Sequence, residues 1–297
     1  MKPTESSDNK NRILSNGADQ MPQAQALPKQ PEQRRDRRVY TLKSDREIIR
    51  KFAEFQYLTN AQVAALTGRK ESRMRERLRN LYLAGILNRV TSAAETSVPY
   101  LSPQPYVYFL DPKGGELAYE LGYLPAPRGT ESKSRLMIGH DLEITKFHIA
   151  LHNALQGQPY EWKQWRGELK DTIVIDGEPQ ALIPDAYFFF QNKCFFLEIV
   201  KSKETEYVNG ESNIERKFKT YLAYQDGFAQ KYCREDFRVI WVFPTRERVV
   251  RILSKLENAH PYRKFWLTDE ESYERNIKGK IFWTPKDFRD ATYGLFG

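Results

Sequence analysis

The 297-residue chain contains only two cysteines, Cys194 and Cys233, and they lie far apart. Two such cysteines exclude a disulfide framework and a zinc site of closely paired thiolates, and are typical of an intracellular protein. No apolar run reaches the ~18 residues that cross a membrane. No apolar signal segment opens the chain either. We therefore expect a cytoplasmic protein without membrane contact.

A glycine-rich phosphate loop is also missing, which argues against ATP chemistry. Basic residues are what the chain has in excess, with 47 Lys+Arg against 39 Asp+Glu and a net charge of +8. This balance favours a polyanionic partner such as DNA. The length predicts two domains, each with a hydrophobic core.

Residues 1–38 are rich in Gln, Asn, Ser and Pro and end in a run of arginines, Arg34 to Arg38. They have too few apolar residues to fold by themselves, so a disordered basic tail is predicted. Such a tail is either simply solvated or touches phosphates.

Residues 39–124 have the pattern of a winged helix. Helical spacing predicts helices from Ser44 to Phe55, from Thr59 to Gly68 and from Glu71 to Ala84, followed by a β-hairpin and a closing helix. The third helix is the expected recognition helix. The basic side chains at and before its start, and along it, are the candidate DNA-binding residues, with a solvated helix face as the alternative: Lys70, Arg73, Arg75, Arg77 and Arg79.

A Pro- and Ser-containing linker is predicted at residues 125–135, followed by a second domain at 136–297 with a C-terminal extension. This domain should begin with a helix from His140 to about Leu155. Strands and helices alternate after it, and the apolar run Phe237–Phe243 predicts a strand covered on both faces. The expected fold class is α/β (α+β), with a mixed sheet.

The second domain centres on a predicted hairpin, with strands at about 182–190 and 194–200 around the polar step Gln191-Asn192-Lys193. With Asn192 at the centre of the turn, Asp185 falls opposite residue 199, beside Glu198. Two acids on a mostly buried sheet need a positive partner. A divalent cation with oxygen ligands would supply it.

Several segments together resemble the replication-relaxation family, which includes the MOBC-type plasmid mobilization relaxases. They are Gly139-His140-Asp141-Leu142-Glu143, Ile183-Pro184-Asp185-Ala186, Phe196-Leu197-Glu198-Ile199 and Lys217-Phe218-Lys219-Thr220-Tyr221. The resemblance implies a winged helix joined to a PD-(D/E)xK restriction-endonuclease-like domain. It further implies that Asp185 and Glu198 bind Mg²⁺ or Mn²⁺, which would activate water for attack on DNA.

One position departs from this pattern. Two residues after Glu198, where an active nuclease has Lys and this family commonly has Asp, the chain has Val200. A lysine from elsewhere would have to replace it: Lys201, Lys203 or, as the best candidate, Lys217 on the following helix. A lysine near the metal acts as a point charge on the phosphate. A surface role for Lys217 is the alternative.

The roles of other polar residues of the second domain can each be interpreted in two ways. His140 and Glu143 could add metal ligands or support them, or His140 could bond backbone at a helix start. His148 and His152 are four residues apart, a spacing that can bind metal but more often reflects packing. Tyr221 fits a packing residue better than a nucleophile, and the histidine spacing of tyrosine relaxases is absent.

Three functions follow. The first is a Mg-dependent nicking endonuclease of a mobile element, acting on DNA at a transfer or replication origin. The second is a DNA-binding or regulatory protein whose nuclease fold has lost activity, which Val200 favours. The third is a transcriptional regulator that binds DNA only through the arginine helix. The protein could associate with itself or with other mobilization or replication proteins.

Overall fold

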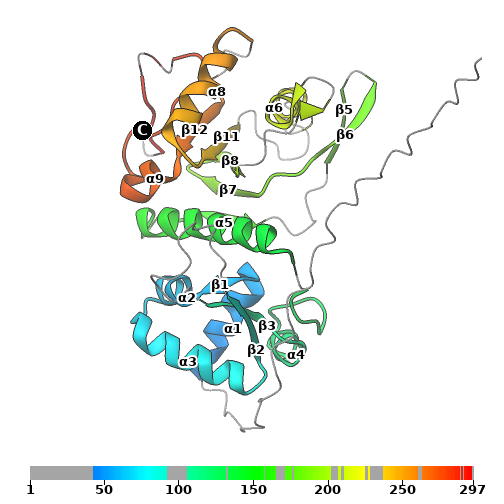
Figure 1. Ribbon diagram of the computed structural model, residues 1–297, viewed down its shortest axis with the longest axis vertical. Helices are drawn as coiled ribbons and strands as arrows, with labels where there is room; N and C mark the ends of the chain where they lie inside the picture. Colours follow the sequence, from blue (N-terminus) through cyan, green and yellow to red (C-terminus); the bar gives the residue numbers. More distant parts are fainter. Residues whose placement is uncertain are drawn as a thin grey trace, which may run out of the picture. The chain divides into compact units, whose positions relative to one another are not determined.

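The computed structural model describes the ranges 43–91, 106–131, 133–156, 158–164, 171–175, 177–201, 207–208, 211–224, 237–259, 263–287 and 291–295, with residues 227 and 289. The chain divides into residues 1–31, all outside the described set, and residues 32–297, which contain every element below. The predicted tail, residues 1–38, therefore lies outside the described residues. The fold is mixed α+β (Figure 1). In the described part of the chain, no helix is both long and apolar enough to span a membrane.

Three helices come first: α1 (Lys43–Phe55), α2 (Asn60–Thr67) and α3 (Glu71–Leu83). The helix-start signal at Thr59 is confirmed. Its side chain accepts from Gln62 N, and the Gln62 side chain in turn accepts from Thr59 N, which is a capping box. Gly68 ends α2 with φ +65°, a left-handed conformation that suits glycine. The predicted apolar faces are buried, including Ile48, Phe52, Met74 and Leu78.

A three-stranded antiparallel sheet follows, in the order β1-β3-β2. Its strands are β1 (Leu58–Thr59), β2 (Leu87–Thr91) and β3 (Tyr106–Leu110). The helix α4 (Pro112–Glu120) packs so closely that a Cβ on Gly114 would lie 2.0 Å from the carbonyl oxygen of Ile86. The helices and this sheet have the element order predicted for a winged helix.

A five-stranded mixed sheet with the order β12-β11-β8-β7-β4 forms the second part. Its strands are β4 (Glu161–Gln164), β7 (Ala186–Phe190), β8 (Lys193–Ile199), β11 (Phe237–Phe243) and β12 (Phe265–Asp269). Strand β11 runs parallel to both β8 and β12. Its burial on both faces confirms the prediction from its continuous apolar run.

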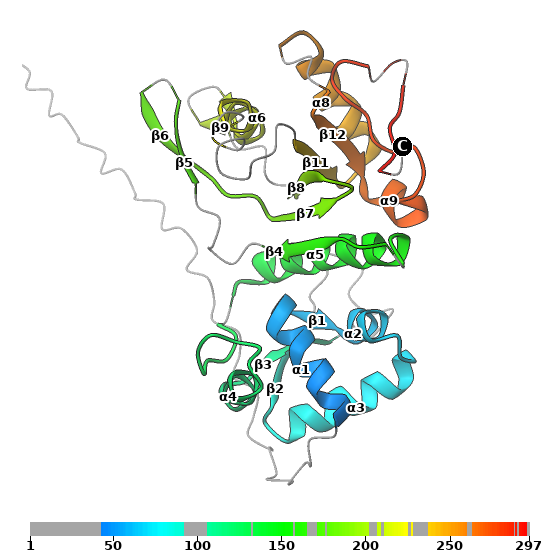
Figure 2. The same ribbon diagram turned by 180° about the vertical axis from the view of Figure 1, so that it is seen from behind.

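Helices cover both faces of this sheet (Figures 1 and 2). On one face, α5 (Arg135–Ala154) and α9 (Glu270–Asn276) contribute to a core with Leu197, Ile199 and Ile240. On the other face, α6 (Asn213–Ala223) and α8 (Arg246–Ala259) pack on Phe196 and Val239. Because strand residues alternate between faces, Glu198 belongs to the α6 side.

The boundaries of three predicted elements were wrong. Helix α5 begins at Arg135 and not at His140, because the Ser134 side chain caps it by accepting from Met137 N. Helix α6 ends at Ala223, short of the predicted Lys231. The strand expected from Leu182 starts only at Ala186, because Leu182 ends a separate strand. The smaller sheets are β5 (Asp171–Ile175) with β6 (Glu178–Leu182), and β9 (Tyr207–Val208) with β10 (Glu211–Ser212).

The turn between β7 and β8 also differs from the prediction by one residue. Phe190 pairs with Lys193 and Ala186 with Leu197, so only Gln191 and Asn192 form the turn. Both have positive φ values, 47° and 61°, as a two-residue type I′ turn requires. The next position along this register places Asp185 opposite Glu198 and not opposite Ile199.

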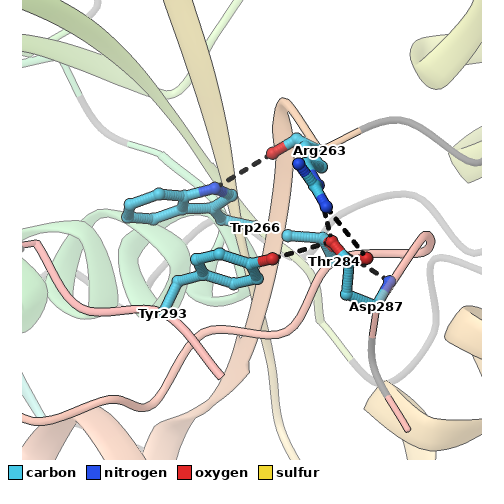
Figure 3. Close-up of polar contacts among 5 residues, drawn as sticks. All are labelled: Arg263, Trp266, Thr284, Asp287 and Tyr293. Carbon is cyan, nitrogen blue, oxygen red and sulfur yellow. Dashed lines mark hydrogen bonds and ion pairs between the residues drawn. The ribbon is translucent and has the colours of Figure 1, made fainter. Parts of the chain in front are cut away.

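The segment after α9 is fixed to the sheet by a polar cluster (Figure 3). Asp287 accepts hydrogen bonds from Arg263 Nε at 2.8 Å and from the Tyr293 hydroxyl at 2.7 Å. Trp266 Nε1 donates to the Arg263 carbonyl oxygen at 3.1 Å. These contacts, with the backbone pairing of Leu267 and Trp283, cover the β12 edge of the sheet.

Candidate functional site

Asp185 lies immediately before β7, and its position is fixed through the backbone. Its N–H donates to the Leu197 carbonyl at 3.0 Å, and its Oδ2 accepts the Ile199 N–H at 2.7 Å. From α5, His140 Nε2 reaches the same Oδ2 at 3.2 Å and lies 3.3 Å from the Ile199 carbonyl oxygen. The carboxylate is therefore held at the end of the hairpin by groups from two elements.

Glu198 lies on β8 with 1% of its surface exposed. Lys217 Nζ on α6 is 2.6 Å from Glu198 Oε2, and the Tyr221 hydroxyl donates to Oε1 at 2.6 Å. Lys217 and Tyr221 are four residues apart, so one face of α6 presents both to the same carboxylate. Tyr221 is fully buried, as expected of a packing residue. Its hydrogen bond to Glu198 could not be predicted from the sequence.

The two acids differ in their electrostatics. Burial, together with nearby Asp185, raises the pKa of Glu198 to about 7 against the opposing effects of Lys217 and Tyr221. Burial also tends to raise the pKa of Asp185, but His140, Lys217 and the Ile199 N–H outweigh it, so the net shift is downward. The surroundings of the two acids thus shift their pKa values in opposite directions, a feature that catalytic carboxyl pairs share.

Two other predicted site residues, Lys201 and Glu143, form an ion pair with each other. Lys201 Nζ is 3.8 Å from Glu143 Oε1, which lies on α5 and also faces Lys146 at 3.7 Å. Val200 is 2% exposed and belongs to the hydrophobic core on the α6 side. Lys203 lies outside the described residues. The structure thus places Lys217 of α6 next to Glu198, whereas Lys201 pairs with Glu143 of α5.

The donor set suits a hard divalent cation. Mg²⁺ commonly uses one or two protein carboxylates and completes its shell with water and substrate phosphate. Asp185 and Glu198 offer two such carboxylates, and each Glu198 oxygen that accepts a hydrogen bond retains a second lone pair. Among the described residues, no group of three or more His, Cys, Asp and Glu side chains is arranged for a metal. His140 and Glu143 therefore do not join the pair as one ligand cluster.

His148 and His152 have a packing role. Tyr160 Oη lies 3.0 Å from His148 Nε2 and 2.8 Å from His152 Nδ1. The His148 ring stacks between Phe55 and Trp162, with centroids at 5.0 and 4.3 Å. Burial, with Lys51 and His152 nearby, lowers the pKa of His148 to about 3, so the ring is neutral and behaves as part of a core.

The basic residues of α3 point in different directions. Arg77 Nε donates to Asp45 Oδ1 at 2.7 Å, and Asp45 is completely buried. Arg77 therefore connects α3 to α1. Arg75 pairs on the surface with Glu71 at 3.3 Å. The exposed members of the predicted set are Lys70, Arg73, Arg75 and Arg79.

Fold and site together define a class of protein: a three-helix unit with a basic helix, joined to a mixed sheet that carries an Asp–Glu–Lys cluster. The model of the replication-relaxation family matches residues 49–237, more than half of the chain. The chain belongs to this family, and the resemblance seen in the sequence is confirmed. Membership indicates interaction with DNA and a role in its replication or mobilization. Comparisons with curated proteins and with solved structures gave no match.

Proposed function

We propose that this protein is a DNA nickase of a mobile element, acting at a transfer or replication origin with Mg²⁺ or Mn²⁺. One observation carries the proposal: Asp185, Glu198 and Lys217 converge from the start of β7, from β8 and from α6. Two carboxylates can hold a divalent cation, and a lysine beside them can stabilise charge on a phosphate, so the three side chains suit metal-assisted phosphodiester hydrolysis. Family membership supports DNA as the substrate.

Each residue has a distinct task in this proposal. Asp185 and Glu198 hold the cation, whose chemistry is to polarise the phosphodiester and make water a stronger nucleophile. Lys217 lowers the pKa of the buried Glu198, which favours its ionised form, and offers a positive charge to the phosphate. Tyr221 fixes the direction of the Glu198 carboxylate, while His140 and the Ile199 N–H fix Asp185.

The basic surface of α3 would bring the protein to its DNA. Its exposed basic side chains are Lys70, Arg73, Arg75 and Arg79. Contacts of such side chains with phosphates supply a large share of the affinity for DNA. The sheet domain would then cut near the bound sequence. A cytoplasmic location and partners among other mobilization or replication proteins, or a second copy of the chain, complete the proposal.

The test is a nicking assay on supercoiled DNA that carries the native origin. With Mg²⁺ or Mn²⁺ we expect open-circular product, and with EDTA none. Asp185→Asn, which keeps the shape but not the charge, should lower the rate at least about a hundredfold. Glu178→Gln on β6, an exposed acid outside the cluster, is the matched control and should act like the wild type. Equal nicking by wild type and Asp185→Asn would overturn the assignment of the site.

A second candidate is a DNA-binding protein that does not cut. Val200 favours it, because the side chain at the usual lysine position is buried in the core and has no charge. In that case Lys217 only neutralises Glu198. Specific binding of the origin with no open-circular product, across both metals and several salt concentrations, would establish this candidate and reject the nickase.

A further inference from the structure

Arg89 on β2 lies between two tyrosine rings. Its guanidinium carbon is 4.3 Å from the centroid of Tyr82, near the end of α3, and 3.9 Å from that of Tyr106, at the start of β3. The side chain therefore bridges the last turn of the basic helix and the adjacent hairpin. Cation–π contacts of this kind hold a guanidinium in a fixed orientation.

Stacking of both faces leaves only the edge of the guanidinium for hydrogen bonds. Its Nε is buried and has no hydrogen-bond partner among the described residues, while part of the residue remains exposed to solvent. No acidic side chain of the described residues forms an ion pair with it in the structure, in contrast to Arg77 with Asp45. A planar fork of donors, held rigid and still charged, matches the geometry of a phosphate group.

The position of Arg89 continues the basic surface of α3. Arg75, Arg79 and Tyr82 follow the spacing i, i+4, i+7, so they lie along one stripe of the helix. Arg75 and Arg79 are exposed. Arg89 packs over Tyr82, at the end of this stripe, and so extends it from α3 onto β2.

We propose that Arg89 binds a phosphate of the DNA backbone and that Tyr82 and Tyr106 hold its guanidinium ready for this contact. The duplex would then meet Arg75 and Arg79 on the helix and Arg89 on the hairpin as one continuous surface. The inference rests on the DNA-binding half of the proposed function and is independent of nicking.

The test is the salt dependence of binding to a labelled duplex that contains the native origin, measured by fluorescence anisotropy with the full chain. Arg89→Gln keeps a planar group between the rings but removes the charge. It should weaken binding about tenfold and reduce the slope of log K against log salt by about 0.9, the value for one lost phosphate contact. Arg89→Lys should keep the slope and lose about threefold in affinity, because the ammonium lacks the stacked fork.

Two controls separate the outcomes. Arg275→Ala on α9, an exposed arginine paired with Glu271, should change neither affinity nor slope. Arg75→Ala and Arg79→Ala should each reduce the slope. If they do so and Arg89→Gln does not, Arg89 only joins the hairpin to α3 and the inference is rejected while DNA binding by α3 stands. If none of the three changes the slope, the DNA-binding half of the proposed function fails as well.

Discussion

Lys217 Nζ lies 2.6 Å from Oε2 of Glu198, a carboxylate with almost no exposed surface. The lysine comes from α6 and not from the strand that carries the acid. A charged partner can thus reach a buried acid from a neighbouring element when the usual strand position holds an apolar residue. The electrostatic partner of Glu198 is therefore determined by position in space and not by position in the sequence.

Replacing Lys217 should strongly reduce the nicking rate. Lys217→Ala removes the charge beside Glu198, and we expect the nicking rate to fall by about 10²–10³, the usual effect of removing one stabilising group at a developing charge. The nicking assay measures this loss directly. Lys219→Ala, two residues further along the exposed part of α6, should retain the wild-type rate. Wild-type nicking by Lys217→Ala would exclude this lysine from the site.

Tyr221 should set the pH at which the site becomes active. Its hydroxyl bond lowers the pKa of Glu198, which burial raises to about 7. If only ionised Glu198 binds the cation, the Mg²⁺ concentration needed for half-maximal nicking should rise as the pH falls through about 7. In Tyr221→Phe this rise should begin at higher pH, while the rate at high pH and saturating Mg²⁺ changes less. A Tyr221→Phe profile that is lowered equally at every pH would show that the tyrosine acts only in packing.

Stability should also depend on the Glu198 proton, in a direction that follows from its raised pKa. The unfolded chain releases this proton near pH 4.5, whereas the native state retains it up to about pH 7. Between these values the native state binds more protons, so the free energy of unfolding falls as pH rises. Urea unfolding from pH 4.5 to 8 should show this decline in the wild type and a flatter curve in Glu198→Gln. Parallel curves would contradict the raised pKa.

Arg77 and Arg79 are only two residues apart on α3 but should behave oppositely. Arg77→Ala leaves Asp45 buried without its guanidinium partner, so we expect a loss of about 1–3 kcal/mol of unfolding free energy. Arg79→Ala should stay within about 0.5 kcal/mol, as exposed substitutions usually do, but should weaken DNA binding. Urea unfolding and anisotropy on both variants separate the two effects. Equal stability of the two variants would refute a supporting role for Arg77.

Local patterns predicted most of the elements correctly. The capping box at Thr59, the apolar face of α1 and the continuous run of β11 each contain their own signal, because burial imposes a fixed period on the side chains. The convergence of Asp185 with Glu198 could also be expected, since a short hairpin brings its ends together. Lys217 was predicted from the family resemblance and its place on the next helix.

Other features depended on partners far along the chain. The sequence of α3 does not show that Arg77 meets Asp45, which lies 32 residues earlier. Tyr221 fits an amphipathic helix whether or not its hydroxyl reaches Glu198, 23 residues away. The strand β12 and helix α9 were not predicted at all, because their signals are short and the sheet edge they complete is built by distant segments.

The turn at Gln191 and Asn192 has a consequence for how such a site can change over generations. Because side chains alternate between the faces of β8, an insertion or deletion in this turn that shifted the register of β8 by one residue would point Glu198 toward α5 and present a leucine or isoleucine to Lys217. The cluster would then be lost without a substitution of any of its own residues, through a change at a turn that does not belong to it.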